Sequence, residues 1–163
     1  MNHTEIITSI FASCGYKNYL ELGLYQGETL QAISQYASFA IGVDRKDLRL
    51  NKSLNLFLGT TTDFFINNQN KFDMIFIDAD HHVDAIQRDL IESLKILNEY
   101  GTIILHDTDP NNKMLLDPGY CNNAYLIHNF LNATGLTWIT LPINECGLTI
   151  VRRSRDMRHI KIL

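Results

Sequence analysis

The sequence predicts an α/β fold in which a mostly parallel sheet carries helices on both faces and ends in a C-terminal antiparallel hairpin. Short, nearly all-apolar segments alternate with segments of helical periodicity, which is the pattern of a parallel sheet covered on both faces. Only a short turn separates the last two strand-like segments, 137–141 and 147–152, so these strands must pair antiparallel. The chain has 163 residues and no repeat or linker, so we expect a single domain over residues 1–163.

The individual elements follow from apolar spacing and from the residues that end each run. A first helix is expected over 4–14, where Gly15 provides a stop. Strands are then expected at 18–23, 39–43, 54–58, 73–77 and 102–105, and helices at 27–36, 61–68, 83–97 and 122–133. The polar stretch 108–121 contains proline and glycine and is interpreted either as a lid over a site or as a surface loop.

Composition and charge exclude several classes of function. The net charge of −4 argues against a general nucleic-acid-binding protein, and the basic run 152–161 is interpreted as a solvated strand end and tail. Cys14, Cys121 and Cys146 form no C-x-x-C pair, so neither a zinc knuckle nor a disulfide framework is predicted. No leader or membrane-spanning run is found, so we expect a cytoplasmic protein without a membrane partner, in an oligomeric state that stays open.

The segment 19–30 carries the strongest local signal. It is a short apolar strand that contains Glu21 and leads through Gly23 and Gly27 into a helical pattern. A glycine loop between a strand and a helix is how open α/β sheets form a cofactor site, but the G-x-G-x-x-G order of dinucleotide loops is missing. Asp44 ends the second strand and can accept hydrogen bonds from ribose hydroxyls; the alternative is that it caps a helix over 45–50.

Polar and mostly acidic residues follow nearly every expected strand. They are Glu21 and Gly23, Asp44, residues 59–63, residues 78–82 and residues 106–109. The carboxyl ends of parallel strands lie at one edge of a sheet, where ligands bind. Several carboxylates gathered there repel one another unless a cation or ligand hydroxyls compensate. The sequence therefore predicts a ligand site at this edge.

A set of short motifs extends the signal to most of the chain. In order they are Glu-Leu-Gly-Leu-Tyr-Gln-Gly, Gly-Val-Asp, Gly-Thr-Thr-Thr-Asp-Phe-Phe, Phe-Ile-Asp-Ala-Asp-His and Ile-Ile-Leu-His-Asp. Over roughly residues 18–107 and the closing hairpin, this set resembles class I S-adenosylmethionine (SAM) methyltransferases, in particular the metal-dependent O-methyltransferases of the catechol, caffeoyl-CoA and macrocin types. The resemblance implies a Rossmann-like SAM methyltransferase domain that methylates a hydroxyl group of a small molecule.

The resemblance also implies roles for individual residues. The residues implied to bind SAM are Glu21, Gly23, Tyr25, Gly27, Asp44, Thr61, Thr62, Asp63 and Asp78. A Mg²⁺ ion is implied at Asp78 and Asp107, with Asp80 or Asp109 as helpers. Catechol-type relatives have asparagine as a third metal ligand where this chain has Thr108, a weaker ligand.

Two histidines are candidates for the general base. His81 stands three residues after Asp78, where the catechol-type relatives carry a lysine, and the ordinary pKa of histidine suits proton transfer near neutral pH. His106 is the second candidate, and both histidines can instead be structural. Two rival functions are a SAM-binding module without catalysis and a manganese-dependent DHH phosphoesterase, the latter suggested by Asp80-His81-His82.

Overall fold

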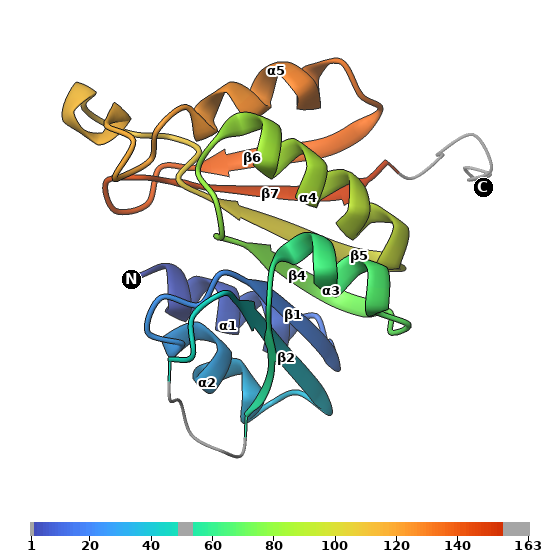
Figure 1. The fold of residues 1–163 in the computed structure, drawn as a ribbon. Helices are drawn as coiled ribbons and strands as arrows, with labels where there is room; N and C mark the ends of the chain where they lie inside the picture. Colours follow the sequence, from blue (N-terminus) through green and yellow to red (C-terminus); the bar gives the residue numbers. More distant parts are fainter. Residues whose placement is uncertain (1, 49–53, 155–163) are drawn as a thin grey trace, which may run out of the picture.

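The computed structural model describes residues 2–48 and 54–154, and they form a seven-stranded sheet in the order β3-β2-β1-β4-β5-β7-β6 (Figure 1). The strands are β1 (Asn18–Leu22), β2 (Phe39–Asp44), β3 (Asn55–Leu58), β4 (Phe72–Ile77), β5 (Leu97–His106), β6 (Leu136–Leu141) and β7 (Leu148–Arg153). The first five strands pair in parallel, and β7 runs antiparallel to both β5 and β6. The predicted fold class is confirmed, including the C-terminal hairpin.

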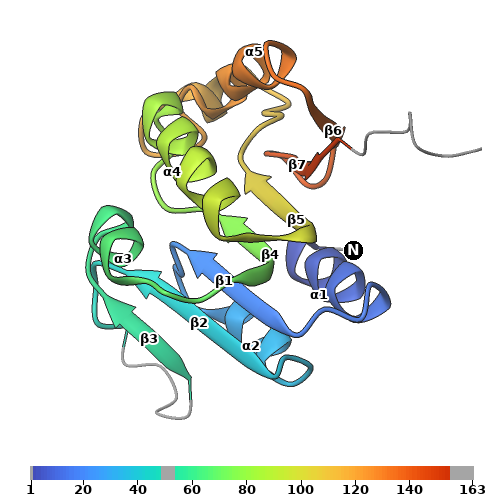
Figure 2. The same ribbon diagram turned by 90° about the vertical axis from the view of Figure 1, so that its right-hand side faces the viewer.

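Helices cover both faces of the sheet. They are α1 (His3–Ser13), α2 (Glu28–Ser34), α3 (Thr61–Asn67), α4 (Val83–Ile96), α5 (Ile127–Asn132) and the short 3₁₀ helices η1 (Lys113–Leu116) and η2 (Ala124–Leu126). Figure 2 shows α1 and α2 on one face and α3, α4 and α5 on the other. None of the helices within the described residues has the length and apolar character needed to cross a membrane.

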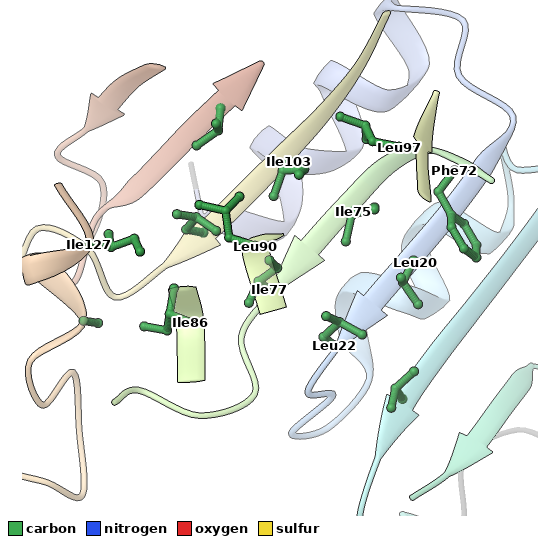
Figure 3. Packing of buried hydrophobic residues seen from close by; sticks show 14 of the residues in the cluster. Leu20, Leu22, Phe72, Ile75, Ile77, Ile86, Leu90, Leu97, Ile103 and Ile127 are labelled. Carbon is green, nitrogen blue, oxygen red and sulfur yellow. The ribbon is translucent and has the colours of Figure 1, made fainter. Parts of the chain in front are cut away.

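Each face of the sheet has its own buried cluster, because successive strand side chains point to opposite sides. Leu20 and Leu22 of β1 pack in the cluster beneath α3, α4 and α5, which also contains Leu90 of α4 (Figure 3). Tyr19, the residue before Leu20 in β1, points to the other face and packs in the second cluster with Phe11 of α1. The apolar strands of the sequence are therefore explained by burial on both faces.

The structure differs from the sequence expectation mainly in β5. The strand begins at Leu97, directly after α4, whereas the apolar run predicted only 102–105. Its pairing with β4 shifts register between Phe72 and Met74, and a Cβ at Gly101 would lie 2.8 Å from the carbonyl oxygen of Asp73. This close approach accommodates a polar, glycine-containing strand start that periodicity does not reveal.

The structure also bears on the helices expected at 122–133 and 45–50 and on the basic run 152–161. The predicted helix 122–133 is a 3₁₀ turn followed by the shorter α5, with Asn122 at a positive φ of 50°. The suggested helix over 45–50 and the basic run 152–161 lie partly outside the described residues. Residues 45–48, which are described, form no helix.

The strand order places a switch point between β1 and β4. From β1 the chain builds outward to β2 and β3, then returns to β4 on the other side of β1 and continues to β5. The loops after these strands are tied by backbone bonds, since Gly23 donates to Val43 at 2.9 Å and Asp78 donates to Leu22 at 2.8 Å. Open α/β sheets bind ligands in the crevice at such a point.

We expect Leu90→Ala to destabilise the fold by about 2–5 kcal/mol, because Leu90 is fully buried between α4 and the sheet and its truncation leaves a cavity. Urea denaturation measures the loss. The matched control is Ile91→Ala, whose side chain is 37% exposed on the same helix and should cost about 1 kcal/mol or less. Equal losses in the two variants would contradict the described packing.

Candidate functional site

A cavity of about 950 Å³ opens at the carboxyl ends of the central strands. Among the predicted site residues, those that line it are Glu21, Gly23, Tyr25, Asp44, Thr61, Thr62, Asp78, Asp80, His81, His106 and Asp107. Three predicted residues, Gly27, Asp63 and Asp109, are not part of its lining. The sheet edge thus brings most of the predicted side chains into one space, at the switch point between β1 and β4.

The glycine loop after β1 has the shape that its sequence predicts. Gly23 has a φ of +84°, and a Cβ there would lie 2.2 Å from the carbonyl oxygen of Asp78. Gly27 has a φ of +71° and precedes α2 as its N-cap. Both glycines are required by the loop itself, and the neighbouring Tyr25 is held at a positive φ with its side chain 82% exposed.

Asp44 ties the end of β2 to this loop. One carboxylate oxygen accepts a hydrogen bond from the backbone amide of Leu24 at 3.0 Å, and the other accepts from Lys46 at 2.8 Å. A carboxylate oxygen can accept more than one hydrogen bond, so Asp44 keeps free acceptor capacity toward the cavity.

Glu21 lies deep beneath the loop. Its side chain is almost fully buried, and the hydroxyl of Tyr19 donates to it at 2.7 Å. Burial raises the pKa of Glu21 well above its usual range, and the hydrogen bond from Tyr19 only partly opposes the shift. Burial therefore favours the neutral carboxylic acid over the carboxylate at this position.

The threonines after β3 begin α3. Thr60 and Asp63 form a capping box: the Thr60 hydroxyl accepts from the Asp63 amide at 3.0 Å, and the Asp63 carboxylate accepts from the Thr60 amide at 3.3 Å. The same carboxylate also accepts from the Thr60 hydroxyl at 2.6 Å. Asp63 is thereby engaged in helix capping. Thr61 lines the cavity and donates to the buried Asp89 of α4 at 2.9 Å, which fixes the orientation of the threonine.

Four side chains from the end of β5 and from the loops after β4 and β5 form the Asp–His cluster: Asp78, His81, His106 and Asp107. Nε2 of His81 lies 3.1 Å from Asp107 and 3.7 Å from Asp78. Nδ1 of His106 lies 3.2 Å from Asp78 and 3.1 Å from Asp107, although it makes no hydrogen bond of normal geometry. Asp107 adopts a positive φ of 60°, which turns its buried carboxylate toward both imidazoles.

The cluster is an arrangement of opposite charges. Hydrogen bonding to Asp78 outweighs burial and raises the pKa of His81 to about 9. Burial lowers the pKa of His106, but the interactions with Asp107 and Asp78 dominate and raise it to about 10. Burial likewise opposes ionisation of Asp107, yet the two histidines hold its pKa at about 2. Near neutral pH both histidines are therefore cations beside two carboxylates.

This finding corrects one premise of the sequence interpretation. An ordinary histidine pKa was expected to make His81 ready to accept a proton at neutral pH, whereas its carboxylate neighbours favour the protonated form. Nδ1 of His81 also contacts the backbone carbonyl of Tyr120, which can only accept, so that nitrogen carries a hydrogen. Only Nε2 is left for proton exchange.

The other predicted helpers are placed less favourably. Asp80 lines the cavity, but one of its oxygens accepts from the His82 amide at 2.9 Å. The hydroxyl of Thr108 is buried in contact with Thr149 at 2.7 Å, and Asp109 is exposed outside the cavity lining. His82 caps α4 and is also outside the lining, which separates it from the Asp–His cluster.

The structure adds cavity residues that the sequence interpretation missed. His3 enters from α1, with its ring 4.9 Å from that of His106. Burial and the neighbouring His106 lower the pKa of His3, so its imidazole is neutral near pH 7. Tyr120, Cys121 and Cys146 also line the cavity. No periodicity or motif marks these residues, because tertiary packing of a helix and two loops brings them to the sheet edge.

The segment 108–121 is part of the cavity wall. Its last three residues line the cavity, and the carbonyl of Tyr120 contacts His81. Leu115 in η1 is buried and anchors the segment to the body of the domain. The end of this stretch therefore contributes to the cavity wall, and its role as a lid stays a prediction.

We expect the free energy of unfolding to fall as pH rises from about 6.5 through about 10, because the folded pKa values of His81 and His106 exceed the unfolded value. Their contribution is complete below about pH 6.5 and is lost as the folded protein releases these protons. Urea denaturation across this range measures the slope. Asp107→Asn should flatten it, and an identical slope in both proteins would contradict the charge assignment.

Comparison with known proteins agrees with this architecture. The comparison with curated protein sequences found no match. Among solved structures, a Staphylococcus aureus protein assigned as a caffeoyl-CoA O-methyltransferase has a TM-score of 0.74 and 19% identity, over 93% of this chain and 82% of the other. A Bacillus cereus O-methyltransferase in complex with SAH has a TM-score of 0.70 and 15% identity, over 92% and 80% of the two chains.

The same fold also occurs with a different acceptor atom. The N-methyltransferase NodS from Bradyrhizobium japonicum has a TM-score of 0.67 and 12% identity, over 91% of each chain. At such identities the likeness establishes the fold alone. The sequence match is more specific, because residues 20–108 match the family model described as a methyltransferase domain, which is more than half of the chain. The chain therefore belongs to the methyltransferase domain family.

Proposed function

We propose that this chain transfers the methyl group of SAM to a hydroxyl group of a small molecule. One observation carries the proposal: a single cavity joins the glycine loop and Asp44 to the Asp–His cluster. The first part suits a nucleoside cofactor, and the second suits control of an acceptor's proton. A volume of about 950 Å³ is at the upper end of the range of small-molecule sites and accommodates two ligands together.

The cofactor half of the cavity is built from backbone and carboxylate groups. The Gly23 loop lets a ligand approach the backbone, Asp44 offers acceptors to ribose hydroxyls, and Thr61 and Thr62 face the position proposed for adenine. The SAH-bound structure of the Bacillus cereus enzyme supports SAM as the cofactor class for this fold. We further propose that residues 1–163 form one SAM-dependent methyltransferase domain.

The acceptor half must remove a proton as the methyl group moves. In the proposed reaction the acceptor oxygen displaces the sulfonium sulfur in line, the C–S bond breaks, and the products are a methyl ether and the thioether of the cofactor. The hydroxyl proton passes to Nε2 of His81 in its neutral form. Asp78 and Asp107, at 3.7 and 3.1 Å, then stabilise the imidazolium that results.

The chain fits an oxygen-liganded Mg²⁺ ion less well than the resemblance implies. Asp78, His81 and Asp107 place donor atoms within 4.8 Å of one another, but the carboxylates already face imidazoles. Thr108 turns its hydroxyl away, and Asp109 lies outside the cavity lining. Magnesium prefers six oxygen ligands, several of them water. We therefore derive no step of the proposed reaction through Mg²⁺.

Asp44→Ala should weaken SAM binding by about 1–3 kcal/mol, because ribose hydroxyls would lose a charged acceptor. Isothermal titration calorimetry with SAM and with SAH measures the change. Asp84→Ala removes a carboxylate from the exposed side of α4, outside the cavity lining, and should bind both ligands as the parent chain does. Unchanged affinity in Asp44→Ala would contradict the ribose assignment.

His81→Ala should lower turnover about 10²–10⁴-fold while SAM still binds, because a general base is lost. The parent rate should rise with pH toward about 9, since the base must first lose the proton that its carboxylate neighbours retain. A methyl-acceptor screen with small hydroxylated compounds, run with and without Mg²⁺ and with chelator, supplies the assay.

His106→Ala, made in parallel, separates the two histidines. If His81→Ala keeps its rate and His106→Ala loses it, the role passes to His106. Binding of SAM without turnover on any hydroxylated acceptor would favour a non-catalytic SAM-binding module. Loss of activity on chelation would instead restore a metal to the mechanism.

A further inference from the structure

A second group of donor atoms adjoins the Asp–His cluster and has no role in the proposed reaction. A carboxylate oxygen of Asp107 and the sulfur atoms of Cys121 and Cys146 all lie within 4.8 Å of one another. The thiol of Cys121 contacts Oδ1 of Asp107 at 3.4 Å. Asp107 and Cys121 are buried, Cys146 is half-buried, and both cysteines line the cavity.

Backbone packing brings these three residues together from distant parts of the sequence. The amide of Asp109 donates to the carbonyl of Cys146 at 2.7 Å, which joins the β6–β7 turn to the segment after β5. The turn approaches so closely that a Cβ at Gly147, whose φ is +70°, would lie 2.4 Å from Cβ of Asp109. The amide of Cys121 donates to Leu115 at 2.9 Å, which holds the second thiol in place. The convergence is therefore set by the fold around it.

We propose that Asp107, Cys121 and Cys146 form a binding site for a thiophilic divalent cation of the zinc type. Two thiolates and one carboxylate are a donor set that Zn²⁺ accepts in four-coordinate geometry, whereas Mg²⁺ and Ca²⁺ select oxygen ligands alone. A three-ligand protein site with its fourth position open is the arrangement of catalytic zinc. Both cysteines line the cavity, so a cation bound to them would be reached from it.

The two clusters share Asp107. Its Oδ1 lies 3.4 Å from the sulfur of Cys121 and 3.1 Å from Nδ1 of His106, while its Oδ2 lies 3.1 Å from Nε2 of His81. A cation bound at Oδ1 would therefore share that oxygen with His106. A cation at the thiols leaves the His81 contact in place. Bound there, the cation would add positive charge beside the carboxylate of Asp107.

The same two cysteines offer a rival outcome, an internal disulfide. Their sulfur atoms lie within 4.8 Å of one another, so the experiment must separate a disulfide from metal binding.

Cobalt is the probe that tests the site. The full chain is reduced, freed of metal with chelator and titrated with Co²⁺ in the absence of SAM. We expect one ion per chain, a thiolate-to-cobalt charge-transfer band in the near ultraviolet, and displacement of the band by Zn²⁺ but not by Mg²⁺. Cys121→Ser and Cys146→Ser should each lower the affinity for Co²⁺ by about 10–100-fold or more. Substitution of residues that only orient metal ligands already lowers metal affinity by this factor.

Cys14→Ser is the matched control, because Cys14 is exposed and outside the cavity lining. It should keep the band and the affinity. Circular dichroism of each variant confirms folding, so that a lost band reports the site and not the fold. No band in the parent chain, a band that survives in Cys121→Ser, or cobalt bound through oxygen alone would overturn the proposal. So would a disulfide between Cys121 and Cys146 that survives the reduction step, seen by intact mass. Because the titration contains no SAM, failure of the proposed methyl transfer leaves its outcome unaffected.

Discussion

The site depends on one electrostatic constraint: two carboxylates meet at neighbouring strand ends in a mostly buried position. Asp78 follows β4 and Asp107 follows β5, and the parallel pairing of these strands brings their side chains together. Buried carboxylates destabilise one another unless they are paired. His81 and His106 supply that pairing, with nitrogen–oxygen distances of 3.1–3.7 Å. The carbonyl of Tyr120 contacts the other ring nitrogen of His81, which links the 108–121 segment to the same cluster.

The charge pairing gives a histidine a fixed orientation but makes it a weaker candidate for accepting a proton at neutral pH. A histidine beside a carboxylate is well oriented, but the carboxylate also makes its proton harder to remove. An enzyme that uses such a histidine as a base works best at alkaline pH, or needs a ligand that weakens the ion pair. His3 differs from the other two histidines, because burial beside a cation keeps it neutral. The three imidazoles around this cavity therefore differ in charge, although they belong to the same residue type.

Sequence reasoning succeeded where position along a strand determines position in space. Asp44, Asp78 and Asp107 were assigned to one sheet edge because parallel strands end on the same side, and the structure brings all three to one cavity. It failed where packing between separate elements decides. No periodic or motif signal marks His3, Cys121 or Cys146, because α1 and two loops bring them to the cavity. The start of β5 was missed for a related reason, because a register shift and Gly101 replace the apolar pattern there.

The placement of His3 in the first turn of α1 has a practical consequence for work with this protein. Its ring stands against that of His106, and Asn2 caps the helix immediately before it through reciprocal bonds with Glu5. A purification tag fused directly ahead of this capping box would begin close in sequence to His3, which lines the cavity. A hexahistidine tag would also offer imidazoles that compete for a metal ion in a binding experiment. Preparations with the tag cleaved or moved elsewhere would keep ligand affinities attributable to the chain itself.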